Sequence, residues 1–486
     1  MESQFRKSAY DCLQRATWGV RNEEQTQEVK LPDAMPDIGR VLGAWGQPLL
    51  RSKEWRGNAM GLSGGVMVWV LYAPEDERMP RVVEAWLPFQ LRFDFPQTQR
   101  DGSIVANCLL RGVDARSVSA RKLMVRAVVS VAAEALEPGQ VQLSVPEAMP
   151  EDVCLLKKTY PVEMRVEAGE KSFLIDEDLL LPESCKTVEK LVYYNIQPEI
   201  MEKKVMADRL VFRGTAKIHT LCRCADGTLQ GCDFETPFSQ YAELERQHSE
   251  RAWAEIVPAV TSLEMEIAED GSLRLKAGLI GQYTVSDRQT LEVVADAYSP
   301  YRQVQLQIQE LGLPAVLERR QESIAAEHTC AMEGARMLDT CFNAGHPAQF
   351  REDGMLRLEL TGAFQTLYYD NDGNLQGNSC PWEHSWQLPA AEDTTVLAVT
   401  GHHSQPEVAV ELMTCADTVI PVVTAVEPEA MGELDPQRPS LILRKKGMAS
   451  LWDLAKQCGS TVEAIQQAND LEAEAGEDCF LLIPVL

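Results

Sequence analysis

One motif occurs twice in this sequence, at a spacing typical of a duplicated domain. It reads DGTLQG at residues 226–231 and DGNLQG at residues 372–377. An alternating run that contains a glycine precedes each copy, with Gly214 in one case and Gly362 in the other. A proline–aromatic pair follows each copy: Pro237-Phe238 and Pro381-Trp382. Because these features keep their order, we expect the chain to contain repeated folding units.

One more copy precedes these two in the chain, so it is the first of three. Gly64-Gly65 opens the apolar run GGVMVWVLY, and Pro88-Phe89 follows it. The opening LPDAMPDIGRVL, from Leu31, resembles LPESCKTVEKLV, from Leu181. This first copy has PEDERMP in place of the Asp-Gly motif, and the third copy lacks a clear Leu-Pro opening. Three copies, about 150 residues apart, are the simplest interpretation.

A repeat of this length is a whole domain, because solenoid repeats are about 20–50 residues long. The sequence therefore predicts tandem β-sandwich-like domains that form a long arm, followed by a small C-terminal module. The expected organisation is a first β-domain at 1–150, a second at 151–300, a third at 301–425, a linker at 426–440 and the module at 441–486. The segment 36–45, PDIGRVLGAW, fits either a short helix or a first strand.

Strand periodicity dominates the central part of the chain. Residues 209–220, RLVFRGTAKIHT, alternate apolar and polar side chains, and Leu356, Leu358 and Leu360 do the same. Such alternation is typical of a sheet with one face in water. Residues 263–276 predict a hairpin that turns at Asp270-Gly271, because glycine adopts positive φ without steric cost.

In that hairpin, Glu264 and Glu266 should lie opposite Arg274 and Lys276, which favours pairing of the two arms. Elsewhere, Trp382 and Trp386 would share one face of a strand. Packing in a core is the simpler interpretation for both, and a contact site for a partner is the alternative.

The C-terminal module has the pattern β-α-α-β. A short strand at SLILR is followed by a helix whose capping box is Ser450 with Asp453. Gly459 should end this helix. A second capping box is expected at Ser460–Glu463, before the second helix. The run FLLIP, 480–484, returns as a strand.

The module is small, so its core needs every apolar side chain available. The helical spacing predicts one buried stripe from the first helix and one from the second: Leu451, Leu454, Ala455 and Cys458, then Val462, Ile465 and Ala468. Trp452 is expected to cover this core.

Charge and composition exclude several classes of protein. The net charge of −27 disfavours binding to nucleic acid. No apolar run is long enough to cross a bilayer, so no transmembrane segment is expected. The first twenty residues mix charged and apolar side chains, which is not the pattern of a secretory signal. The 13 scattered cysteines suit a reducing compartment better than a disulfide framework. These features together favour a cytoplasmic protein.

No pattern predicts catalysis, a metal or a cofactor. Cys222, Cys224 and Cys232 form the only cysteine cluster, with His219 as a conceivable fourth ligand, but the spacing is not that of paired zinc ligands. Burial of the cysteines is the better interpretation. His402 and His403 would point to opposite faces of a strand. No nucleophile elbow and no HExxH motif occur.

The repeated order of Leu-Pro, a Gly-led strand, a D-G tip and a proline–aromatic pair resembles the SPOCS domain of endospore-forming bacteria. Residues 443–471, LRKKGMASLWDLAKQCGSTVEAIQQANDL, resemble a LysM module. SPOCS copies followed by one C-terminal LysM are similar to the SipL-like spore-morphogenesis proteins. That resemblance implies a non-enzymatic scaffold in spore coat and cortex assembly. It implies a mother-cell location at the forespore surface, with the LysM docking a coat-assembly ATPase or another coat protein.

LysM modules generally hold N-acetylated sugars between two loops. By resemblance, the groove residues here are Lys446, Gly447, Met448, Ala449, Ser450, Asn469, Asp470, Leu471 and Gly476. The usual Gly-Asp-Thr-Leu-Trp is replaced by a longer loop without the Asp, and the second loop is acidic. Both departures weaken the sugar interpretation, and the acidic loop fits a basic protein partner at least as well as a neutral sugar. Binding of peptidoglycan or N-acetylglucosamine is the alternative, and Asn469 fits either a helix cap or a ligand contact.

Overall fold

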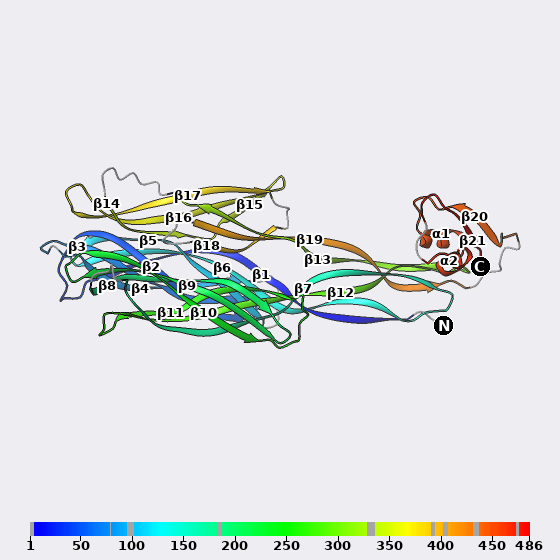
Figure 1. Cartoon of the computed structure of the whole chain (residues 1–486), viewed down its shortest axis with the longest axis horizontal. Helices are drawn as coiled ribbons and strands as arrows, with labels where there is room; N and C mark the ends of the chain where they lie inside the picture. Colours follow the sequence, from blue (N-terminus) through cyan, green and yellow to red (C-terminus); the bar gives the residue numbers. More distant parts are fainter. Residues whose placement is uncertain are drawn as a thin grey trace.

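The computed structural model describes residues 4–77, 79–94, 102–182, 187–327, 336–389, 394–401, 407–430, 437–472 and 476–486. These residues form long antiparallel strands, with two short helices near the C-terminus (Figure 1). The expectation of a mainly β chain is therefore confirmed. The histidine pair at 402–403 and part of the expected linker, 431–436, lie outside the described residues.

Strands β1 to β19 form three lobes with one plan. In each lobe the first strand pairs with the last, and the last also pairs with the one before it. The strands between them form a second sheet. The first lobe contains β1 (Gln4–Lys30), β2 (Ile38–Arg56), β3 (Ala59–Pro74), β4 (Arg81–Asp94), β5 (Ser103–Ser119) and β6 (Lys122–Ala148).

The other two lobes repeat this plan, and the third has one additional short strand, β15. The second lobe contains β7 (Cys154–Leu179), β8 (Val188–Val205), β9 (Arg209–Cys224), β10 (Leu229–Glu243), β11 (Trp253–Ile267) and β12 (Leu273–Tyr298). The third contains β13 (Val304–Ala325), β14 (Arg336–Ala344), β15 (Ala348–Glu352), β16 (Met355–Tyr369), β17 (Leu375–Pro389), β18 (Thr394–Gly401) and β19 (Glu407–Pro428). Strand β19 continues past residue 425, where the sequence placed the start of the linker.

The first two lobes share even their backbone irregularities. The β2–β3 ladder shifts register between Ile38 and Arg40, Val41 and Gly43, and Leu50 and Ser52. The β8–β9 ladder shifts at positions 150 residues later: Val188/Lys190, Leu191/Tyr193 and Ile200/Glu202. The segment 36–45, which the sequence left open between helix and strand, lies largely in β2. Since β-bulges bend and twist a sheet in a defined way, the two sheets have matching shapes.

The repeated glycine and the repeated proline–aromatic pair have one physical explanation. In every lobe the glycine lies directly across the ladder from the aromatic residue: Gly64 opposite Phe89, Gly214 opposite Phe238, and Gly362 opposite Trp382. A Cβ at Gly64 would lie 2.7 Å from the ring of Phe89, and it would overlap the carbonyl oxygen of Leu49. Gly214 has the same two obstacles in its own lobe. Glycine is therefore required where an aromatic ring or a neighbouring backbone covers the strand.

The predicted alternation of buried and exposed side chains is confirmed. Leu210, Phe212, Ala216 and Ile218 are buried, and so are Leu356, Leu358 and Leu360. In the 263–276 hairpin, Glu264 lies opposite Lys276 and Glu266 opposite Arg274, as expected. Trp382 is buried against Phe342, and Trp386 packs against the same core. Core packing is thus the correct interpretation for both tryptophans.

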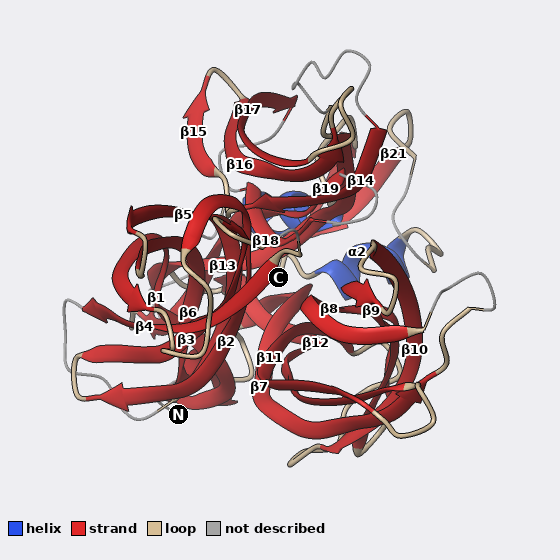
Figure 2. Ribbon diagram, turned by 90° about the vertical axis from the view of Figure 1, so that its left-hand side faces the viewer, coloured by secondary structure: helices blue, strands red, loops and turns tan. Residues whose placement is uncertain are grey.

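The three lobes lie side by side in one body, not end to end as the predicted arm required. Seen along the long axis, they surround a common centre (Figure 2). Their first and last strands extend beyond this body as three antiparallel ribbons that form a stalk (Figure 1). A small apolar core joins the second and third ribbons, and it contains Val153, Val294, Ala297, Val423 and Val426. The elongated shape therefore comes from long strands within each lobe.

Each pair of lobes is in contact, so the three form a closed arrangement. The junctions use different residues: Trp45 stacks on Tyr193 between the first and second lobes, His219 meets Asp339 between the second and third, and Gln365 bonds to the Val113 carbonyl between the third and first. Each lobe therefore uses two of its sides to contact the other two lobes, and this arrangement is complete with three copies.

The C-terminal residues form a separate small fold, which we call the tip. It consists of β20 (Leu441–Lys445), α1 (Leu451–Cys458), α2 (Val462–Ala468) and β21 (Phe480–Pro484). The capping box of Ser450 and Asp453 is present, and Gly459 ends α1 at φ 66°. The predicted order of strands and helices is thus confirmed. The tip's core includes Leu451, Leu454, Ala455, Ile465, Leu481 and Ile483.

Two details of the tip differ from the prediction. The N-cap of α2 is Thr461, whose side chain accepts from the Ala464 amide, and not Ser460. Ser460 is buried, its carbonyl accepts from Tyr298 of the second lobe, and its side-chain oxygen forms no hydrogen bond with a described residue. Ala468 is exposed because α2 ends at this residue.

Neither helix has the dimensions of a membrane-spanning segment. Helix α1 has 8 residues and α2 has 7, and the described part of the chain contains no long apolar helix.

Candidate docking surface on the tip

The two predicted groove loops flank the short sheet of the tip. Residues 446–450 connect β20 to α1, and residues 469–476 lie between α2 and β21, with 473–475 outside the described residues. The Lys446 amide donates to the Cys479 carbonyl at 2.9 Å, and the Gly447 amide donates to the Glu477 carbonyl at 3.0 Å. These bonds hold the first loop against the residues that follow Gly476. Gly447 and Asp470 both adopt positive φ.

Asn469 has a structural role. Its amide nitrogen donates to the carbonyls of Ile465 and Leu482 at 2.8 and 2.7 Å. Its amide oxygen accepts from the Leu482 backbone at 2.8 Å. Both N–H donors of the side chain are thus used inside the tip. Of the two roles that the sequence left open, the helix-end role is the one its contacts support.

The outer face of the tip sheet is apolar and exposed. Five large apolar residues lie on or beside it, with the exposed fraction of each: Leu441 52%, Leu443 66%, Met448 92%, Phe480 66% and Leu482 39%. Leu443 pairs directly with Leu482 across the ladder. Both helices pack on the other face, where Leu481 and Ile483 are buried. A two-stranded sheet covered on one side necessarily exposes the alternate residues of both strands.

The sequence pattern predicts the two loops, but of the residues on this face it singles out only Met448. The signal was present, because LIL in β20 and FLLI in β21 are continuous apolar runs without alternation. Such runs in a module with helices on one face only must leave every second side chain in water. Contiguous exposed apolar residues mark interaction sites on proteins more often than single ones do.

The tip contacts the second lobe through its helical side. The indole N–H of Trp452 donates to the Asp296 carboxylate at 2.9 Å. The Trp452 ring packs edge-on against the Tyr298 ring, and the two ring centroids are 4.7 Å apart. Lys456 binds the same carboxylate at 2.7 Å. Trp452 therefore lies at the junction with the second lobe, and does not serve only as the cover of the tip core that we expected. This orientation leaves β20 and β21 on the side away from the junction.

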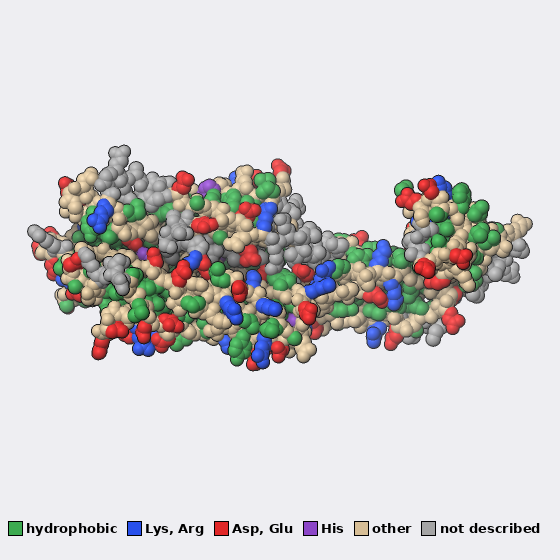
Figure 3. Space-filling model, in the orientation of Figure 1, with side chains coloured by type: hydrophobic (Ala, Val, Ile, Leu, Met, Phe, Trp, Pro, Cys, Tyr) green, Lys and Arg blue, Asp and Glu red, His purple; other side chains and the backbone are tan. Residues whose placement is uncertain are grey.

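Hydrophobic side chains are visible on the tip at the end of the stalk (Figure 3). Charged residues adjoin them in β20 and in the segment that precedes β21. Arg444, Lys445 and Lys446 follow one another in β20 and the first loop, and Lys445 pairs with the fully exposed Asp478 at 2.9 Å. An apolar centre with a charged rim is the usual anatomy of a protein-binding surface.

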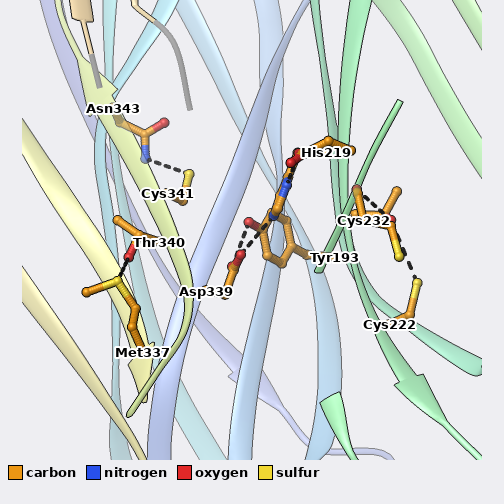
Figure 4. Close-up of polar contacts among 11 residues, drawn as sticks. Tyr193, His219, Cys222, Cys232, Met337, Asp339, Thr340, Cys341 and Asn343 are labelled. Carbon is orange, nitrogen blue, oxygen red and sulfur yellow. Dashed lines mark hydrogen bonds and ion pairs between the residues drawn. The ribbon is translucent and has the colours of Figure 1, made fainter. Parts of the chain in front are cut away.

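A second group of polar residues lies inside the body, where the second and third lobes meet (Figure 4). His219 contacts Asp233 of its own lobe at 2.6 Å and Asp339 of the third lobe at 3.0 Å. The other oxygen of Asp339 accepts from the Tyr193 hydroxyl at 3.1 Å. Tyr193 in turn stacks on Trp45 of the first lobe, so this chain of contacts joins all three lobes.

The cysteine cluster does not include this histidine. Both ring nitrogens of His219 face carboxylates, and Cys222 instead donates to the Thr220 hydroxyl (Figure 4). Cys222, Cys224 and Cys232 are buried, as expected. In the part of the chain that the structure describes, no group of three His, Cys, Asp or Glu side chains is placed to hold a metal. Cys380 is disulfide-bonded, which the scattered spacing did not indicate.

The polar cluster predicts a pH-dependent stability. Burial acts to lower the pKa of His219, but the bonds to Asp233 and Asp339 outweigh it and raise the pKa to about 9. A raised pKa in the folded state stabilises the protein fully below the unfolded value of about 6.5, and this contribution is lost as pH rises through about 9. We expect the loss to be about 2–3 kcal/mol.

Urea unfolding of the wild type and of His219→Gln, at pH 6.5 and pH 9, measures this effect. The wild type should lose more stability than the variant over this interval. Equal losses in the two proteins would show that His219 does not titrate as inferred.

A cavity of about 150 Å³ lies where the three lobes meet. Its described lining has no acidic, basic or histidine side chain, and strands β2, β8 and β14 of the three lobes contribute to it: Gln47 and Pro48, Gln197 and Pro198, and Asn343 and Ala344. Cys108 is the one described lining residue with a titratable side chain, and burial raises the pKa of its thiol to about 12.

Comparison of the chain with protein-family models, with curated proteins and with solved structures found no match in any of the three.

Proposed function

We propose that this protein is a non-enzymatic scaffold of spore coat and cortex assembly. In this proposal the three lobes are SPOCS-like units, the tip is LysM-like, and the protein acts in the mother cell at the forespore surface. The tip docks a coat-assembly ATPase or another coat protein. Support comes from the repeated motif and from the predicted β-α-α-β order of the tip.

The observation that carries the proposal is the exposed apolar face of the tip. Leu443, Phe480 and Met448 are each at least 66% exposed. Leu443 and Phe480 lie on strands that the junction with the second lobe leaves free, and Met448 lies in the loop after β20, all at one end of an elongated molecule (Figure 1). A face of this kind favours a macromolecular partner, because burial of apolar area stabilises a complex.

A charge placed on this face should abolish docking. We expect Leu443→Asp to weaken binding of a purified coat-assembly ATPase by more than tenfold, since the carboxylate would lose its hydration in the interface. Leu174→Asp is the matched control, because Leu174 is also on a strand and is 61% exposed, but lies in the second lobe. Titration calorimetry with the full chain measures both. Equal affinities for the two variants would contradict the proposed surface.

A glycan-binding protein of the cell wall or spore envelope is the alternative. The observation in its favour is that backbone bonds hold the loop of Lys446 and Gly447 against residues 477–479, which leaves the loop backbone near a possible sugar site. Titration with N-acetylglucosamine oligomers separates the two functions. Saturable sugar binding that survives Leu443→Asp would favour the alternative.

A further inference from the structure

The two edges of the tip sheet differ in their hydrogen bonding. In an antiparallel pair, residues alternate between those bonded to the partner strand and those whose N–H and C=O point away from it. The Lys446 amide bonds to Cys479, and the Val485 amide bonds to Ser440. The register therefore turns the backbone groups of Ile442 and Arg444 toward β21. Those of Leu441, Leu443 and Lys445 point outward.

The outer edge of β21 is closed. The Asn469 side chain bonds to both the N–H and the C=O of Leu482, as a neighbouring strand would. Pro484 has no N–H to offer. The structure thus blocks strand pairing on this side with two separate devices.

The outer edge of β20 is open. No described residue forms a hydrogen bond with the outward backbone groups of Leu441, Leu443 or Lys445. The side chains of all three are exposed. Natural proteins usually protect such an edge with proline, a bulge, a covering segment or charged side chains, because it is a template for another strand. Here a proline and the Asn469 side chain block the edge of β21, whereas the described edge of β20 has only the exposed charges of Arg444 and Lys445.

We propose that the partner docks by adding an extended strand to the open edge of β20. Backbone bonds to Leu441, Leu443 and Lys445 would supply affinity, and alternate side chains of the added strand would extend over the apolar outer face. This inference rests on the proposed function and specifies how its docking site works.

The charges near this edge define the chemistry of the added strand. Arg444, Lys445 and Lys446 are three consecutive cations in a chain whose net charge is −27. Among the described residues Lys445 pairs only with Asp478, which is 96% exposed, and such pairs contribute little to stability. The occupant is therefore a partner segment that alternates apolar residues with acidic ones.

Proline substitution tests this mode directly. Leu443→Pro removes one outward N–H and leaves the β20–β21 bonds intact, since those use the neighbouring residues. Leu443→Thr removes a similar apolar area and retains the N–H. We expect Leu443→Pro to bind the purified coat-assembly ATPase at least tenfold more weakly than Leu443→Thr does. Lys445→Pro removes the next outward N–H and replaces Leu443→Pro if that variant unfolds.

The outcomes separate the inference from the function. If the wild type binds and the proline and threonine variants have equal affinity, strand addition is wrong and the docking surface stands. If the wild-type full chain binds neither the ATPase nor any other purified coat protein, the proposed function is wrong and the inference fails with it.

Discussion

Replacing Gly377 with alanine is expected to open the junction between the third and first lobes. Gly377 ends the second copy of the six-residue motif and lies in β17 against β2. A Cβ there would overlap the carbonyl oxygen of Leu42, and backbone cannot move aside as a flexible side chain can. The nearby bond from Arg40 to the Leu375 carbonyl, 2.8 Å long, would be lost with the contact. Overpacking of this kind costs about 3 kcal/mol.

Urea unfolding compares this variant with Gly312→Ala, for which the structure shows open space around the added Cβ. Gly377→Ala should unfold at a clearly lower urea concentration, and the control should match the wild type. A Gly377→Ala protein as stable as the control would mean that β17 and β2 are not in contact as described.

Trp452→Ala is expected to release the tip from the second lobe without unfolding it. The tip keeps its own core of Leu451, Leu454 and Ile465. The substitution removes the edge-on contact with Tyr298 and the bond to the Asp296 carboxylate. An aromatic pair contributes about 0.5–1.5 kcal/mol, and a hydrogen bond to a charged group about 1.5–3 kcal/mol. The junction should therefore weaken by about 2–4 kcal/mol.

Small-angle scattering of the full chain would show a broader distribution of tip positions in this variant. Trp452→Phe is the matched control, since it retains a ring against Tyr298 and loses only the hydrogen bond, and it should have an intermediate effect. If Trp452→Ala instead unfolds helices α1 and α2, then Trp452 belongs to the tip core, as the sequence alone suggested.

The repeats were predictable because they impose constraints on the local backbone. A glycine is required where an aromatic ring crosses the strand, and an Asp-Gly pair forms a tight turn, so Gly214 and Gly227 keep their places relative to Phe238. These requirements act within one sheet and leave a trace in the sequence. The alternation of buried leucines in β16 was predictable for the same reason.

The assembly of the lobes was not predictable from these patterns. The junctions use an aromatic stack at Trp45, a histidine ion pair at His219 and an amide at Gln365, so no repeated residue marks them. Each side chain also had an adequate explanation within its own lobe. His219 was expected on a wet face, but the third lobe covers that face.

The junction between the tip and the second lobe was missed for a related reason. Trp452 packs against the tip core as expected, but it and Ser460 were assigned roles inside the module alone, because a module considered by itself has no neighbour. Asp296 of the second lobe contacts Trp452, and Tyr298 of that lobe contacts Ser460. Pro300, which follows the lobe, contacts Arg438. The exposed face was missed because apolar residues in a small module were assumed to be needed for its core.

Hydrogen–deuterium exchange of the full chain, with and without a purified coat-assembly ATPase, tests most directly whether the tip is the docking element. The account predicts slower exchange in the complex for backbone amides of residues 441–450 and 476–484, with the lobes unchanged. Slower exchange confined to the lobes, with the tip unaffected, would contradict it.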